Sequence, residues 1–287
     1  MLWGYWRRSA SKSSSPSRLV CRYPYRCKPI ARQGDSPQCG EMSRSDRGDG
    51  HQLGVASAIP SSEGATINIK EIIIMITKTI SMCQGKGSLS HNNREFTAKN
   101  IDPLRTANNI VFVQQDLGEA YHQLFDEAVE RYNAHQKRKD RMIDDYFLHL
   151  FNREPSKSVI TGANKQKSFY EDLVQIGTKD DTGVGTPDAE VAVACLKEYM
   201  EGFQKRNPNL YVFNAVMHLD EATPHLHINY IPVGHYDRGL DTRNAMAKAL
   251  EEMNFGHDAS AINRWRLKEW AVLSNICAEH GIDISEP

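Results

Sequence analysis

The sequence contains no hydrophobic run long enough to cross a membrane. The longest apolar stretch, EIIIMI at residues 71–76, falls far short of the roughly 20 residues that a membrane-spanning helix needs. The first residues, MLWGYWRRSASKSSSPSR, also lack the continuous apolar core of a secretory signal peptide. We therefore expect a soluble protein of the cytoplasm.

Paired cysteines and an excess of basic residues are missing as well. The six cysteines are scattered and form no C-x-x-C pair, which argues against a disulfide framework and against a zinc knuckle. With 35 basic and 36 acidic residues, the net charge of -1 indicates no overall attraction to nucleic acid, although it does not exclude a local basic groove. The 287 residues allow one large domain or two small ones.

The composition changes sharply after residue 67. The residues before this point are rich in Ser, Arg, Gly and Pro and show no periodicity, so they cannot bury enough apolar surface to offset their ordering entropy. Lys70 and Glu71 can be encoded by the core of a bacterial ribosome-binding site, and three Ile codons separate this pair from Met75. We predict that residues 1–74 are a disordered or non-native leader and that Met75 is the true first residue. A basic DNA-binding arm is the alternative for this leader.

From Met75 onward, hydrophobic periodicity predicts interspersed strands and helices. We expect strands at 75–82, 169–177, within 207–220 and at 225–234, and helices at 117–138, 187–205, 243–254 and 260–280. Asp116 is the predicted cap of the first helix, and Pro187 is expected to begin the second. The two histidine-bearing strands lie close in sequence, which favours an antiparallel hairpin. The predicted fold class is α+β, an antiparallel-centred sheet with flanking helices, in one domain over residues 75–287.

Three histidines lie within MHLDEATPHLHINYIPV, residues 217–233. His225 and His227 are two apart on a predicted strand, so their side chains share one face. The connection LDEATP returns the chain antiparallel, which lets His218 lie opposite this pair. Three neutral imidazole nitrogens that converge in this way can bind a divalent metal and leave positions open for phosphate or water.

Two acidic residues, Asp220 and Glu221, lie in the same connection. Either could orient an imidazole N–H group, or one could act as a base. This geometry alone does not name the chemistry, because three-histidine sites with an open position also serve zinc hydrolases and non-haem oxygenases.

A second polar group, LSHNNREFTAKNID at residues 89–102, follows the first predicted strand. Within it, His91 could act as a nucleophile or a base, and Arg94 could bind a phosphate oxygen. Asn92 could donate a hydrogen bond. A surface salt bridge is the alternative interpretation of Arg94.

Together with YEDLVQIGTKDDTG, RGLDTRNAMAKALEEMNF and HGIDI, these motifs resemble the MobV-type (Pre/Mob) plasmid mobilisation relaxases, or plasmid recombination enzymes. The resemblance runs from Met75 to the C-terminus, and the elongated helical C-terminal region of such proteins is expected to be absent from this chain. It implies a histidine-hydrophobe-histidine relaxase fold. In that fold, His225-Leu226-His227 and His218 would be the ligands of manganese or magnesium.

The resemblance also implies a reaction. Such enzymes nick one strand at a plasmid transfer origin and rejoin it through a covalent protein–5′-phosphate intermediate, and His91 holds the position of the family's histidine nucleophile. Arg94 is expected to hold a phosphate, and Glu221 to orient or deprotonate His91 or a metal ligand, with Asn92 and Asp220 supporting the site. Formal alternatives for the nucleophile are Tyr121, Tyr132, Tyr170 and Tyr230.

The implied partner is plasmid origin DNA, as a hairpin with flanking single strand, in the cytoplasm of a bacterium. Other relaxosome or coupling proteins are further expected partners. In HQKRKDR, a predicted basic helix end, the residues expected to follow DNA phosphates are Lys137, Arg138, Lys139 and Arg141. A solvated helix face is the alternative. Two other functions compete: a non-catalytic origin- or promoter-binding protein with the same fold, and a metal hydrolase or oxygenase that acts on a small molecule.

Overall fold

The computed structural model describes residues 77–286. The predicted leader at 1–74 and the predicted start at Met75 lie outside these residues. None of the described helices is both long and apolar enough to span a membrane.

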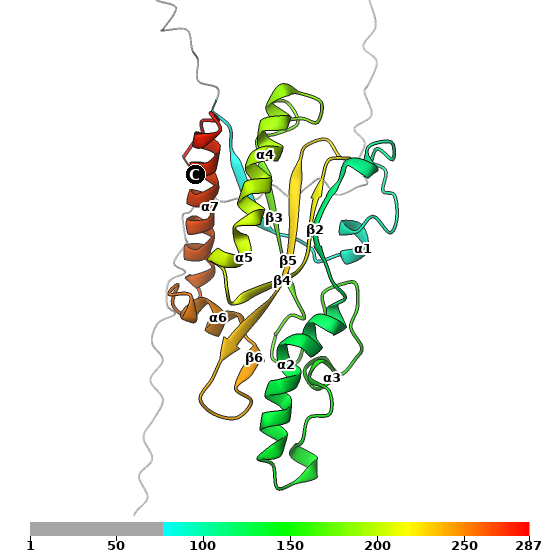
Figure 1. Ribbon diagram of the computed structural model, residues 1–287, viewed down its shortest axis with the longest axis vertical. Helices are drawn as coiled ribbons and strands as arrows, with labels where there is room; N and C mark the ends of the chain where they lie inside the picture. Colours follow the sequence, from blue (N-terminus) through cyan, green and yellow to red (C-terminus); the bar gives the residue numbers. More distant parts are fainter. Residues whose placement is uncertain (1–76, 287) are drawn as a thin grey trace, which may run out of the picture.

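A six-stranded sheet forms the centre of the molecule (Figure 1). Its main path runs β1-β3-β5-β4-β2, β6 pairs with β5, and every strand pairing is antiparallel. The strands are β1 Ile80–Gln84, β2 Ile110–Gln114, β3 Tyr170–Ile176, β4 Leu210–His218, β5 His225–His235 and β6 Thr242–Asn244. The predicted α+β class and the predicted antiparallel hairpin, β4–β5, are confirmed.

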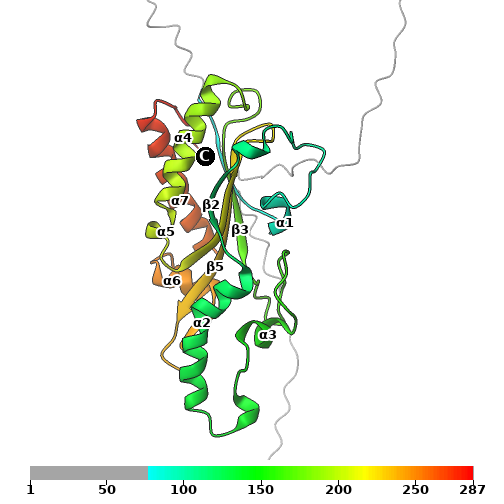
Figure 2. The same cartoon turned by 45° about the vertical axis from the view of Figure 1, so that its right-hand side comes forward.

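Within residues 77–286, seven α-helices accompany the sheet. Their bounds are α1 Leu89–Asn92, α2 Leu117–Ala134, α3 Tyr146–Phe151, α4 Pro187–Glu201, α5 Phe203–Arg206, α6 Met246–Glu252 and α7 Ala261–Glu279. In Figure 2, α4 to α7 cover one face of the sheet, and α1 lies on the other side. Helices α2 and α3 pack together beyond one end of the sheet (Figures 1 and 2).

The alternation of side chains along β5 separates two faces of the sheet. Leu226, Ile228 and Tyr230 join the hydrophobic core beneath α4 and α7, and we call this side the helix face. His225, His227 and the residues that share their side form the histidine face. Both faces are buried at β5 from His225 to Gly234, so polar groups on the histidine face need partners inside the protein.

Helix caps explain where two of the helices begin. Asp116 accepts hydrogen bonds from the backbone N–H groups of Gly118 (2.8 Å) and Glu119 (3.2 Å), which confirms the predicted cap of α2. Pro187 is the first residue of α4, as predicted, and the Thr186 side chain caps that helix. The predicted helix at 117–138 is too long, because α2 ends at Ala134. The predicted helix at 187–205 is interrupted at Gly202 and resumes as α5, which ends at Arg206.

Candidate functional site

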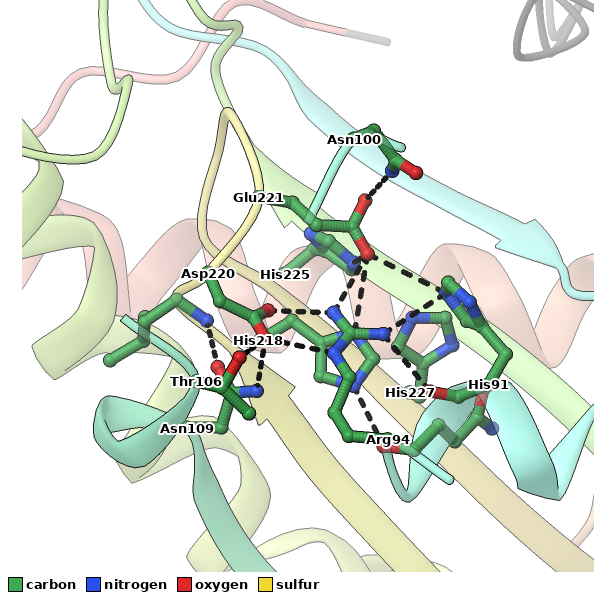
Figure 3. Close-up of polar contacts among 12 residues, drawn as sticks. His91, Arg94, Asn100, Thr106, Asn109, His218, Asp220, Glu221, His225 and His227 are labelled. Atoms are coloured by element: carbon green, nitrogen blue, oxygen red, sulfur yellow. Dashed lines mark hydrogen bonds and ion pairs between the residues drawn. The ribbon is translucent and has the colours of Figure 1, made fainter. Parts of the chain in front are cut away.

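The β4–β5 hairpin brings the three predicted metal ligands together. His218 and His225 are register partners, and Val216 pairs with His227. The ring centroids lie 5.2 Å apart for His218 and His225, 4.5 Å for His218 and His227, and 5.0 Å for His225 and His227. All three histidines are buried. Figure 3 shows them grouped beside Arg94.

Each of these imidazoles has one ring nitrogen bound to an oxygen acceptor. His218 Nε2 lies 2.8 Å from the Asn92 carbonyl oxygen, and His225 Nδ1 lies 2.8 Å from the Thr223 carbonyl oxygen. His227 Nδ1 lies 2.8 Å from Glu171 Oε1. A carbonyl or carboxylate oxygen only accepts, so each of these nitrogens carries the proton. In a neutral ring, the opposite nitrogen, Nδ1 of His218 and Nε2 of the other two, then carries a lone pair.

These lone pairs fit a divalent cation. His218 Nδ1 and His227 Nε2 are buried and have no hydrogen-bond partner among the described residues. Burial lowers the pKa of His218 to about 2 and the pKa of His225 to about 4, so both rings stay neutral at ordinary pH. Two overlapping groups, His91-His218-His227 and His218-Glu221-His225, have ligand atoms within 4.8 Å of one another. Ligand atoms at this separation, with neutral imidazoles at His218 and His225, suit metal ligation.

Glu171 on β3 belongs to the site although the sequence analysis did not select it. Its Oε1 accepts from His227 Nδ1 (2.8 Å) and Asn92 Nδ2 (2.6 Å), and its Oε2 accepts from the Gly87 N–H group (2.6 Å). Burial raises the pKa of this carboxyl, but the hydrogen bond from His227 and the other donors outweigh burial and lower the pKa to about 2. A Cβ at Gly85 would lie 2.0 Å from Glu171 Oε2, so any larger residue there would have to displace the Glu171 carboxylate. Glu171 thus fixes the tautomer and orientation of His227.

Asn92 connects α1 to the cluster. Its side chain donates to Glu171 and to Asn229 Oδ1 (2.9 Å), while its carbonyl accepts from His218. Asn92 is buried, its carbonyl is the hydrogen-bond partner of His218, and its side chain contacts Glu171, the partner of His227. Asn92, which was predicted to support the site, therefore helps to orient His218 and the Glu171–His227 pair.

His91 also lies on α1, and its imidazole lies beside those of His218 and His227. Its Nε2 is 3.4 Å from Arg94 Nη1 and 3.5 Å from Glu221 Oε1, and its ring centroid lies 5.6 Å from that of His218 and 5.5 Å from that of His227. The His91 side chain is 28% exposed, whereas the three ligand candidates are almost completely enclosed. An incoming ligand can therefore reach His91 from solvent.

The Arg94 side chain is largely enclosed and forms ion pairs with two carboxylates. Its Nη2 donates to Asp220 Oδ1 (2.7 Å) and Glu221 Oε1 (2.8 Å), and its Nε donates to Asp220 Oδ2 (2.9 Å). The salt bridge offered as the alternative role of Arg94 is therefore present, but it is enclosed rather than on the surface, because the side chain is only 8% exposed. The remaining terminal nitrogen, Nη1, donates to the His91 carbonyl (2.9 Å) and points toward His91 Nε2.

The two acidic residues of the hairpin connection have different partners. Asp220 accepts from Arg94, Thr106 (3.0 Å) and Asn109 (2.8 Å), so in the described structure it anchors Arg94 rather than orienting an imidazole. Glu221 Oε1 lies 3.7 Å from His218 Nδ1 and 4.0 Å from His225 Nε2. Burial raises the pKa of Glu221, but the contacts with His91, His225 and Arg94 outweigh it and lower the pKa to about 2.

The predicted DNA-binding residues lie far from this cluster in the fold. The expectation of a basic helix end is wrong, because α2 ends at Ala134 and a turn with a short 3-10 helix, Lys139–Arg141, follows. Lys137 and Arg141 are exposed, as are Arg138 and Lys139, and Arg138 forms an ion pair with Asp140. In Figures 1 and 2 this end of α2 points away from α1 and from the β4–β5 turn.

The tyrosines offered as alternative nucleophiles lie apart from the histidines. Tyr121 is buried and donates its hydroxyl to the Ser168 carbonyl (2.7 Å). Tyr230 is buried on the helix face and donates to Asp172 (2.7 Å). Tyr170 stacks against Tyr230, and Tyr132 is partly buried near the α2 core.

The plasmid recombination enzyme family (Mob_Pre) matches residues 111–282, more than half of the chain. The matched segment contains the three buried histidines and Glu221, and it begins after His91 and Arg94. No curated protein matches the sequence.

Several solved structures are similar to this chain, all of them MobM relaxase domains (MOBV; Mob_Pre) bound to plasmid pMV158 oriT DNA and manganese. The complex with 22 nucleotides at pH 5.5 is 17% identical, covers 73% of this chain and 90% of its own, and has a TM-score of 0.41. The complex with 22 nucleotides and a 3′-thiophosphate at pH 6.8 is 16% identical, with the same coverage and a TM-score of 0.41.

Proposed function

This chain belongs to the plasmid recombination enzyme family, and on that premise we propose that it nicks and rejoins one DNA strand at a plasmid transfer origin. The membership confirms the resemblance to MobV-type relaxases. The proposed reaction passes through a covalent protein–5′-phosphate intermediate on His91. The observation that carries the proposal is the cluster of three buried imidazoles in which His218 belongs to two candidate ligand groups, one with His227 and the more exposed His91 and one with His225 and Glu221.

His218, His225 and His227 would hold a divalent cation. When bound, the cation supplies Lewis-acid polarisation of the non-bridging phosphate oxygens and neutralises developing charge. Of the two predicted metals, manganese fits this donor set better, because magnesium prefers oxygen ligands and retained water molecules.

The chain's own residues account for the strand-transfer step. The lone pair of His91 Nε2 attacks phosphorus, a P–N bond forms, and the bond from phosphorus to the 3′-oxygen breaks. The leaving oxygen takes a proton and becomes a 3′-hydroxyl group. Because the P–N adduct retains the energy of the broken ester bond, the reverse attack by a 3′-hydroxyl rejoins the strand without a nucleotide triphosphate.

Arg94 and Glu221 are proposed to position this reaction. The Arg94 N–H group that points toward His91 Nε2 is placed to donate to a phosphate oxygen at the same point. A general base works best when its pKa lies near the operating pH, and the pKa of Glu221 is lowered to about 2. We therefore assign Glu221 to stabilising the imidazolium that forms on His91 rather than to removing its proton.

The proposed partner is origin DNA with a hairpin and a flanking single strand, with other relaxosome or coupling proteins as further partners in the bacterial cytoplasm. Lys137, Arg138, Lys139 and Arg141 remain proposed phosphate contacts at a distance from the nick site. If they bind phosphates, replacing two of them lowers the slope of log affinity against log salt by about 2.

A supercoiled plasmid that carries the cognate origin, incubated with the protein and manganese, tests the proposal. Nicked circles with protein on the 5′ end support it. Binding without nicking indicates an origin- or promoter-binding protein. The absence of both binding and nicking indicates a metal enzyme that acts on a small molecule.

The variant His91→Ala identifies the nucleophile in the same assay. It should abolish the covalent adduct while origin binding stays nearly intact, because the phosphate contacts that position the DNA are elsewhere. The matched control is His122→Ala, which removes a histidine that is 60% exposed on α2 and pairs with Asp126. A normal adduct yield from His91→Ala would transfer the role to a tyrosine.

A further inference from the structure

Phe96 is the only exposed aromatic residue among residues 77–286. An isolated exposed phenylalanine is ordinary. This one is 51% exposed, and its ring centroid lies 6.2 Å from that of His91, the proposed nucleophile. The phenylalanine, tyrosine or tryptophan ring that is most exposed among the described residues thus lies beside the proposed reacting nitrogen.

The turn that presents Phe96 is held by several contacts. Arg94 has a φ of 54°, a left-handed conformation that is uncommon for residues other than glycine, and its ion pairs with Asp220 and Glu221 hold it there. The Glu95 N–H group donates to the Ser90 carbonyl (2.9 Å), and the Glu95 carboxylate pairs with Lys157 (2.6 Å). The contacts that hold Arg94 next to His91 therefore also fix the backbone position from which the Phe96 side chain projects.

We propose that Phe96 is a stacking platform for the base of a nucleotide directly next to the scissile phosphate. The inference rests on the proposed function. A base joined through one sugar to a phosphate at His91 lies within reach of an aromatic ring at this distance. Aromatic rings stack on every base, and only an unpaired base exposes its face, so Phe96 selects single-stranded DNA at the nick and not a particular sequence.

A nicking assay on oligonucleotides tests this role. The substrate is a single strand spanning the nick site mapped on the supercoiled plasmid, either intact or with an abasic site at one of the two flanking nucleotides. The variants are Phe96→Ala, Phe96→Trp and the control Leu104→Ala, which removes an apolar side chain that is 92% exposed in the segment between α1 and β2. Thermal midpoints verify that each variant is folded.

On the intact strand, Phe96→Ala should lower kcat/KM by about 5- to 150-fold, the range for loss of one stacked base, while Phe96→Trp and Leu104→Ala stay near the parent. One of the two abasic substrates should slow the parent to a similar degree and should not slow Phe96→Ala further. A 2-aminopurine at that nucleotide should be quenched on binding by the parent and not by Phe96→Ala.

Other results separate the failures. If Phe96→Ala nicks as fast as the parent, or is slowed equally on intact and abasic strands, the stacking role is overturned and the proposed function stands. If the parent nicks no strand, the proposed function fails and the inference fails with it.

Discussion

Glu171 and Asp172 are neighbours on β3, both buried, and their side chains lie on opposite faces of the sheet. On the histidine face, Glu171 accepts N–H groups and its pKa is lowered to about 2. On the helix face, Asp172 accepts from Tyr230 (2.7 Å) and Arg266 (2.6 Å), and burial raises its pKa although Arg266 opposes the change. The same kind of side chain on the same strand therefore serves a reactive cluster on one side and the packing of α7 on the other.

The two faces also differ in how completely their polar atoms are paired. Buried side-chain atoms without a partner in the described structure include His218 Nδ1, His227 Nε2, Asn214 Oδ1 and Asn229 Nδ2, all on β4 and β5. Each unpaired buried polar atom costs about 1–3 kcal/mol, so the histidine face sacrifices stability that the helix face retains. This pattern is expected where lone pairs are kept for a ligand.

The largest expected difference between the two faces is in nicking activity, which should depend on the histidine face. His227→Ala should remove most of the nicking activity, and adding His218→Ala should lower it little further, because ligands of one ion act as a unit. Manganese should raise the thermal midpoint of the parent and leave that of His227→Ala unchanged. Independent, multiplicative losses in the double variant would show that the histidines do not share an ion.

The helix face should respond in stability instead. Asp172→Ala leaves Arg266 without its buried partner and should lower the free energy of unfolding by about 3 kcal/mol, measured by urea denaturation. The control Asp126→Ala removes an exposed carboxylate on α2 and should change it by about 0.5 kcal/mol at most. Manganese affinity of the folded Asp172→Ala protein should equal that of the parent, and a large loss would break the distinction between the faces.

Glu171→Gln tests the neighbouring carboxylate. The amide keeps the shape but presents a donor to Asn92 or Gly87, so the tautomer of His227 is less well fixed. Manganese affinity, measured by calorimetry, should fall by about 10- to 100-fold. Unchanged affinity together with a large loss of stability would place Glu171 among the structural residues, with Asp172.

The smallest effect concerns pH in the metal-free protein. Burial lowers the folded-state pKa of His218 to about 2 and that of His225 to about 4, so the unfolded chain binds more protons below the ordinary histidine value of about 6.5. Stability should therefore fall as pH decreases from about 6.5, by about 1.4 kcal/mol per pH unit for each histidine. His225→Gln should remove one such contribution between pH 6 and pH 5 in urea titrations with chelator present, and His122→Ala should not; identical slopes for the parent and His225→Gln would contradict the assigned burial cost.

Sequence periodicity sufficed for the elements that depend on local pattern. The two-residue spacing of His225 and His227 and the short return after His218 predicted the hairpin and the shared face, and Asp116 and Pro187 marked two helix starts. Strand β2 was missed although its sequence, IVFVQ, is a run of β-branched and aromatic residues that favours a strand. Helix α3 and strand β6 were missed because they are short and carry little periodicity.

The site residues that the sequence did not reveal depend on pairing between segments far apart in the chain. Glu171 joins the site only because β3 pairs with β5, more than 50 residues away, and Asp220 reaches Arg94 across 126 residues. A Glu-Asp pair inside an apolar strand was the available signal, since charged residues in such a strand need buried partners. The sequence does not specify which partners they have.

The most direct test of the central claim is to locate the DNA on the protein after nicking. The covalent adduct formed with an origin oligonucleotide and manganese is digested with protease at neutral pH, and the peptide that carries the nucleotide is sequenced by mass spectrometry. If His91 is the nucleophile, the nucleotide will be attached to His91 through an acid-labile P–N bond. Attachment to a tyrosine through an acid-stable bond would contradict the account.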